Sequence, residues 1–109
     1  MTYTPKRLRT PQGFNYTKLE PKRYCADEEW IYRSPRYGKR IRIKQGQIRD
    51  GATGAWDLIS LAWWCHDQLC ADGHWLDGSD VTPWQAACVL GDILRNEGHW
   101  FRAITWKYA

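Results

Sequence analysis

The sequence lacks any apolar run of about 18 residues, the length that a membrane-spanning helix needs. Its N-terminal region also lacks the apolar stretch of a secretory signal peptide. No histidine precedes His66, which excludes the metal-dependent His-Asp phosphohydrolases, because these enzymes need an earlier histidine ligand. The absences predict synthesis in a reducing cytoplasm, where the cysteines stay free thiols: Cys25, Cys65, Cys70 and Cys88.

Acidic residues are scarce in the first half of the chain. Residues 1–49 hold 13 of the 16 Lys and Arg but only 4 of the 12 Asp and Glu, a net charge of +9, whereas residues 50–109 hold 3 and 8, a net charge of −5. A basic half can bind nucleic-acid phosphates, or it can complement the acidic half or an acidic neighbour in an assembly. The second interpretation is favoured, because strand alternation would send the dispersed cations to opposite faces.

The order of patterns along the 109 residues predicts one α+β domain with a modest core. Residues 1–21 contain three prolines and no sustained periodicity, so we expect an extended basic arm that precedes a single domain over residues 22–109. Trp30–Arg33 and Arg40–Ile43 are short β-type runs on either side of a Pro/Gly turn, which predicts a hairpin within a small antiparallel β-meander. In the second run Ile41 and Ile43 share the buried face.

Three C-terminal helices are expected to pack on this sheet. Apolar residues at helical spacing predict the first over about 54–70. Thr82-Pro83-Trp84-Gln85 is a capping box with proline at the first helical position, and the helix that it begins should end at Gly98. A short third helix is expected over about 99–107.

His66, Asp67 and Asp50 are the candidate catalytic residues, though none is a firm assignment. His66 lies within the apolar arc of the first helix, so we expect it to be largely buried and to bond Asp50 or the nearby backbone. Asp50 could equally cap the start of that helix, and Asp67 should face polar surroundings. Cys65 cannot pair with His66, because adjacent helical side chains point about 100° apart.

A zinc site is the other chemistry that these residues suggest. His66, Cys70 and His74 are spaced i, i+4, i+8, and i, i+4 ligands can share one helix face. Structural zinc normally needs four ligands, and Asp72-Gly73 should end the helix before His74. We therefore expect neither a metal nor any other cofactor.

The N-terminal segment and several tryptophans are candidates for binding a partner. An arm with few large apolar side chains has little to offset its ordering entropy, about 1–2 kcal/mol per residue, unless a neighbouring subunit holds it. The cations of the arm would then contact an acidic surface of the partner, and its aromatic rings would anchor the arm there. The expected partner-binding residues are Tyr3, Lys6, Arg7, Arg9, Phe14, Tyr16, Trp30, Trp75 and Trp84.

Three motifs carry a resemblance to a known family. They are residues 46–53, Gly-Gln-Ile-Arg-Asp-Gly-Ala-Thr; the His66-Asp67 doublet; and a terminal segment with Trp100 and Trp106. Over residues 22–108 the chain resembles a family of small domains found mostly in tailed bacteriophages and prophages, whose function is unknown. That family carries Arg and Asp where this chain has Pro83 and Ala87, so a catalytic cluster of the family would be incomplete here.

The resemblance implies a virion structural protein, a small tail, baseplate or head–tail connection component made in the host cytoplasm. Its partners would be other virion proteins, with nucleic acid a less favoured partner. The alternative is a small phage hydrolase, acting on the host envelope or on nucleic acid, that uses His66 as base with Asp50 or Asp67.

Overall fold

The computed structural model describes residues 3–50 and 58–99. Within these ranges six strands precede two helices, so the α+β class is confirmed. The strands are β1 (Lys6–Arg9), β2 (Asn15–Glu20), β3 (Arg23–Ala26), β4 (Trp30–Arg33), β5 (Arg40–Ile43) and β6 (Ile48–Asp50). The helices are α1 (Leu61–Asp72) and α2 (Pro83–Asn96).

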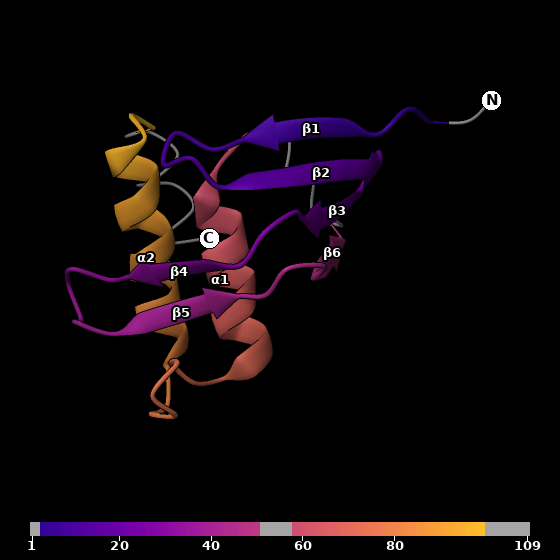
Figure 1. Cartoon of the computed structure of the whole chain (residues 1–109). Coiled ribbons are helices and arrows are strands. Elements are labelled where there is room, and N and C mark those ends of the chain that lie inside the picture. Colours follow the sequence, from indigo (N-terminus) through magenta and orange to yellow (C-terminus); the bar gives the residue numbers. More distant parts are fainter. Residues whose placement is uncertain (1–2, 51–57, 100–109) are drawn as a thin grey trace.

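The strands form two antiparallel sheets. One has the order β1-β2-β3-β6, and the other is the hairpin β4-β5. Figure 1 shows α1 and α2 side by side, with the hairpin crossing in front of them and β1 and β2 above it. The described residues therefore form a strand layer that covers one side of a helix pair.

The predicted hairpin is confirmed at both of its strands. Trp30 pairs with Ile43 and Arg33 with Arg40. Ile41 and Ile43 are 2% and 0% exposed, as the alternation requires, and their neighbours in β5 face outward. Gly38 closes the turn at a φ of 64°, a left-handed conformation that glycine adopts without strain.

The extended arm expected over residues 1–21 is not confirmed. Residues 6–9 and 15–20 form β1 and β2, and β2 pairs in turn with β3. A tight turn joins the two strands, since the Thr10 N–H donates to the Phe14 carbonyl and the Phe14 N–H donates to the Thr10 hydroxyl. The turn directs Phe14 into the core, so this segment belongs to the domain that it was expected to precede.

The first helix begins later in the sequence than expected. Ser60 is its N-cap, and the Ser60 hydroxyl accepts a hydrogen bond from the Ala62 N–H at 2.9 Å. The idea that Asp50 caps this helix is therefore wrong, because Asp50 is the last residue of β6. The part of the prediction over 54–57 lies outside the described residues. Gly73 ends the helix in the left-handed conformation, as its Asp72-Gly73 sequence predicted.

The second helix follows its sequence prediction closely. Thr82 and Gln85 form the reciprocal capping box, with Pro83 in the first turn. The helix ends at Asn96, and Gly98 follows with a φ of 91°. The third helix expected over about 99–107 lies outside the described residues beyond His99.

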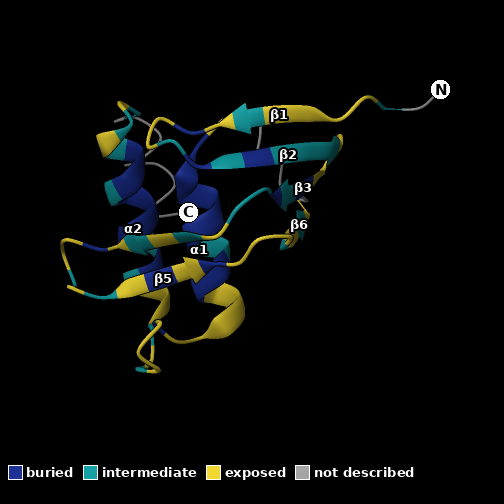
Figure 2. Ribbon diagram, viewed as in Figure 1, coloured by how far each residue is buried: buried dark blue, intermediate teal, exposed yellow. Residues whose placement is uncertain are grey.

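The core is aromatic at its centre. Trp64 is fully buried, with its ring centroid 5.6 Å from that of Phe14 and 5.5 Å from that of Tyr16. Figure 2 shows the buried positions gathered along the two helices and on parts of the strands, while β1 is mostly exposed. The segment that precedes β3 therefore supplies two of the rings around the central tryptophan.

Glu97, just after α2, stabilises the beginning of α1. Its carboxylate accepts hydrogen bonds from the Ser60 hydroxyl and from the Leu61 N–H, the latter at 3.1 Å. It also accepts one at 2.9 Å from Gln12, in the turn between β1 and β2. A negative charge at a helix N-terminus is favourable, so one side chain joins the two helices and the N-terminal turn.

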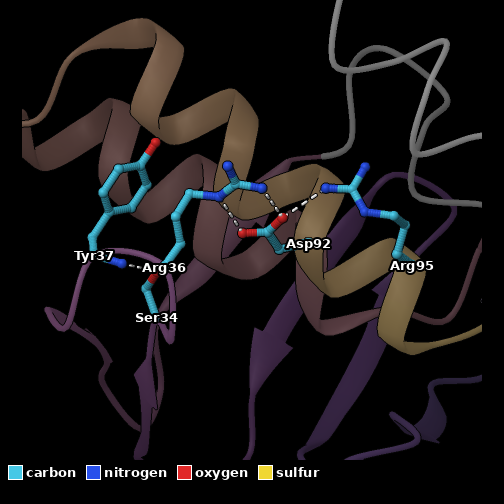
Figure 3. Close-up of polar contacts among 5 residues, drawn as sticks. All are labelled: Ser34, Arg36, Tyr37, Asp92 and Arg95. Carbon is cyan, nitrogen blue, oxygen red and sulfur yellow. Dashed lines mark hydrogen bonds and ion pairs between the residues drawn. The ribbon is translucent and has the colours of Figure 1, made fainter.

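An ion-pair network attaches the β4-β5 turn to α2 (Figure 3). The Arg36 guanidinium donates two hydrogen bonds to the Asp92 carboxylate, at 2.8 and 2.7 Å, and Arg95 donates a third at 2.6 Å. The bonds from Arg36 are the largest cause of a lowered Asp92 pKa. In the same turn the Ser34 hydroxyl accepts from the Tyr37 N–H at 3.3 Å, which fixes the loop that presents Arg36.

Asp92→Asn is expected to lower the free energy of unfolding by about 1 kcal/mol at neutral pH, a modest value because Arg36 is 43% exposed. The folded-state pKa lies below the unfolded value, so this contribution is present above about pH 4 and is lost as the pH falls through the folded-state pKa. Urea denaturation of wild type and variant at pH values of about 7 and 3 measures the difference. Asp80→Asn, at an exposed carboxylate, is the control. A difference that is equally large at both pH values would contradict this assignment.

None of the helices within residues 3–50 and 58–99 is long and apolar enough to cross a membrane. The four cysteines are free thiols, as predicted.

Candidate functional site

The candidate catalytic residues of α1 form a short array on the helix surface. The His66 Nδ1 atom lies 3.6 Å from an Asp67 carboxylate oxygen, and the His66 Nε2 atom lies 3.7 Å from the Cys70 sulfur. The array has the order Asp, His, Cys, and all three side chains come from less than two turns of one helix. The sequence analysis placed Cys70 and His66 on one helix face by their i, i+4 spacing, but it considered the pair only as possible zinc ligands.

His66 is not the buried residue that we expected. Its side chain is 30% exposed, and its contacts are with Asp67 and Cys70 rather than with Asp50. The buried side of α1 carries Cys65 and Leu69, and His66 lies about 100° around the helix from Cys65. The apolar arc drawn from the sequence was therefore too wide.

Asp50 is not part of this array. It is exposed, and it lies opposite Arg23 where β6 pairs with β3. Within the described residues no hydrogen bond or ion pair joins Asp50 to His66. The prediction that these two residues meet is wrong, and a mechanism in which Asp50 orients His66 has no geometric support.

The thiol of Cys70 is not prepared for nucleophilic attack. Burial, and secondly the nearby charge of Asp67, raise its pKa above the ordinary value. Reactive cysteines have the opposite property, a pKa lowered by cations or by a helix N-terminus. The Cys70–His66 contact thus lacks the main electrostatic feature of a cysteine nucleophile.

The proposed zinc ligands separate where α1 ends. Gly73 turns the chain, and the ring of His74 instead donates from Nδ1 to the Trp75 carbonyl at 2.8 Å. Across residues 3–50 and 58–99 there is no group of three His, Cys, Asp or Glu side chains able to hold a metal ion.

A cavity of about 430 Å³ lies between β5, the last turn of α1 and residues 74–76. A partly buried pair of hydrogen bonds supports its wall: Arg49 donates to the Gln68 side-chain oxygen at 3.0 Å, and the Gln68 amide donates to Asp72 at 2.7 Å. The contact between Arg49 and Gln68 was not predicted, because the two residues are 19 positions apart, whereas the i, i+4 spacing of Gln68 and Asp72 could have indicated the second contact. His66 and Asp67 do not line this cavity, so the array on α1 is not associated with it.

The expected partner-binding residues divide into two groups. Phe14, Tyr16 and Trp75 are 0%, 0% and 1% exposed and belong to the core, so assigning them to an interface was wrong. Trp75 is buried because its loop folds back. The backbone N–H of Trp75 donates to the Ser79 carbonyl, and its ring centroid lies 5.6 Å from that of Tyr37. The remaining residues keep some exposure: Tyr3 and Trp30 are half-buried, Lys6, Arg7 and Arg9 are exposed, and Trp84 is 53% exposed.

Sequence reasoning did not predict that β1 would lie at the edge of a sheet. Among residues 3–50 and 58–99 its one pairing partner is β2, which separates it from β3, so no described strand pairs with the other long side of β1. A strand with a single apolar residue, Leu8, gives almost no alternation signal, and its pairing depends on β2.

No protein-family model, curated protein or solved structure matches this chain. The resemblance to the phage family therefore stays a prediction, and a function has to be argued from the residues themselves.

Proposed function

We propose that this chain is a structural component of a bacteriophage virion, a small tail, baseplate or head–tail connection protein. It docks by adding its open edge strand β1 to an extended acidic segment of a neighbouring virion protein. The phage setting is supported by the motif resemblance at residues 46–53 and 66–67. The mode of docking is supported by the backbone of β1.

The backbone groups of Arg7 and Arg9 are directed away from the sheet. The Thr10 N–H bonds to the Phe14 carbonyl, so Thr10 and Phe14 are a hydrogen-bonded pair. Bonded and non-bonded pairs alternate along an antiparallel ladder, and the register puts Arg7 and Arg9 at the non-bonded positions. Their N–H and C=O groups are a template for one more strand. This open edge is the observation that carries the proposal.

The charge of β1 selects the kind of strand that can join it. Lys6, Arg7 and Arg9 are exposed. Two copies of β1 would bring cations against cations across the new ladder, which is destabilising. An acidic strand would place opposite charges there, so the same residues that discourage self-association favour a partner rich in Asp and Glu.

The alternative, a small hydrolase that uses His66, has less support. Asp50 and His66 do not meet, and the His66-Asp67-Cys70 array carries a thiol of raised pKa. Oxyanion stabilisation by positioned donors is usually the largest part of such catalysis, and the described contacts of the array include no such donors.

Arg7→Pro is expected to abolish incorporation into particles while leaving the free protein folded. Proline removes the outward N–H of Arg7 and is tolerated on edge strands. Incorporation is measured by quantitative mass spectrometry of purified particles from the phage or prophage that carries the gene, and circular dichroism verifies the fold of the free variant.

Arg7→Gln is the matched control, because it removes the charge and keeps the N–H. It should reduce incorporation only in part. Wild-type protein absent from particles would refute the virion assignment, whereas folded Arg7→Pro at wild-type occupancy would refute docking through β1.

A further inference from the structure

The outer face of the β4-β5 hairpin is basic. Ile41 and Ile43 point inward, so the residues at the alternate positions share the opposite face. Figure 1 shows the hairpin lying across the helices, which leaves this second face on the outside of the described fold. The face carries Ile31, Arg33, Arg40 and Arg42, and Lys44 continues the row just after β5.

Arg33 and Arg40 stand directly opposite one another. The Ser34 N–H donates to the Lys39 carbonyl at 2.8 Å, so the next pair along the ladder, Arg33 and Arg40, is a non-hydrogen-bonded pair. Side chains approach most closely at such pairs, and like charges there are destabilising. The Arg33 guanidinium lies beside Gly38, where a Cβ atom would be 3.8 Å from one of its nitrogens.

Three other cations of the hairpin form ion pairs, in contrast to Arg33, Arg40 and Lys44. Arg36 is paired with Asp92, Lys39 with Asp77, and Arg42 with Glu29. Among residues 3–50 and 58–99, no carboxylate forms an ion pair with Arg33, Arg40 or Lys44. The acidic partners of the hairpin therefore neutralise Arg36, Lys39 and Arg42, and the outer face keeps the positive charges of Arg33, Arg40 and Lys44.

We propose that this face binds the phosphate backbone of nucleic acid, with Arg33 and Arg40 directed at one phosphate and Lys44 at another. Guanidinium groups form forked hydrogen bonds with phosphate oxygens, and a bound anion would relieve the repulsion within the arginine pair. Arg40 and Lys44 lie four residues apart on this face, roughly 13 Å along the chain, which suits a linear polyanion better than a single small anion.

Nucleic acid fits this face better than an acidic protein does. Protein–DNA interfaces are more polar and much more positive than protein–protein interfaces, whose centres are apolar. Here Ile31, 49% exposed, is the single apolar side chain of the face. Binding should be independent of sequence, because phosphate contacts carry no base information. This function goes beyond docking through β1.

The test is fluorescence anisotropy of a short labelled DNA duplex of mixed sequence, titrated with the whole protein between about 50 and 200 mM salt. For two neutralised phosphates the plot of log affinity against log salt should have a slope of about −1.8. Arg33→Gln/Arg40→Gln should weaken binding at the lowest salt by at least about tenfold and reduce the slope to about −0.9. Its melting temperature should equal or exceed that of wild type, because the repulsive pair is gone.

Lys22→Gln/Arg23→Gln removes the same charge from the end of the β2-β3 turn and the first residue of β3, and its affinity should remain close to that of wild type. Absence of duplex binding by wild type, or equal weakening by both double variants, would overturn the proposal. Unlabelled polyglutamate is the competitor. If it displaces the duplex as well as unlabelled DNA does at equal charge concentration, the face belongs to an acidic protein partner and the nucleic-acid assignment is wrong.

Discussion

Phe14→Ala is expected to lower the free energy of unfolding by about 3–5 kcal/mol, the usual cost of removing a fully buried phenylalanine. Phe14 is 0% exposed, and its ring lies 5.6 Å from that of Trp64 and 5.7 Å from that of Trp30. For a domain of this size each kcal/mol lowers the melting temperature by about 4–8 °C. Thermal unfolding followed by circular dichroism gives the shift.

Two controls make this result specific to the N-terminal segment. Phe14→Leu keeps most of the apolar volume and should lose much less stability. Tyr3→Ala, at a half-buried position before β1, should have a small effect. If Phe14→Ala has the same melting temperature as wild type, the first 21 residues are an arm after all, and the interpretation of β1 and β2 as part of the domain fails.

Glu97→Ala is expected to cost about 2–4 kcal/mol. The substitution leaves the Ser60 hydroxyl, the Leu61 N–H and the Gln12 amide without their acceptor, and it removes a negative charge from the N-terminus of α1. The decrease in the free energy of unfolding should exceed the one caused by removing an ordinary surface carboxylate, because the Glu97 side chain holds three separate segments together. Chemical denaturation in urea measures the change.

Glu97→Gln separates hydrogen bonding from charge. The glutamine amide retains one acceptor oxygen, so the stability of the Glu97→Gln variant should lie between those of wild type and Glu97→Ala. Hydrogen exchange should locate the loss at the first turn of α1. An alanine variant as stable as wild type would show that the Glu97 contacts contribute nothing to the fold.

Local signals in the sequence predicted the elements that depend on local chemistry. The capping box at Thr82 and Gln85 and the hairpin strands 30–33 and 40–43 are confirmed, because each is specified by residues a few positions apart. Strands β1 and β2 were missed, since Lys6–Arg9 has one apolar residue and becomes a strand by pairing with β2.

The burial of His66 was predicted wrongly although its contacts are local, and long-range contacts elsewhere in the fold were not predicted at all. His66 was placed on the buried side of α1 from an arc about one residue too wide, and it turned out to face Asp67 and Cys70. The ion pair of Arg36 with Asp92 spans 56 positions, and the bond of Ser60 with Glu97 spans 37. No periodicity indicates such pairs, which depend on how the helices pack.

Hydrogen–deuterium exchange of the free protein and of assembled particles tests the docking of β1 most directly. In the free protein the outward amides of Arg7 and Arg9 should exchange rapidly, because no strand within residues 3–50 and 58–99 pairs with that side of β1. In particles a peptide covering Lys6–Arg9 should become protected, with α2 little changed. Equal exchange of this peptide in both states, in particles that contain the protein, would contradict docking through the β1 edge.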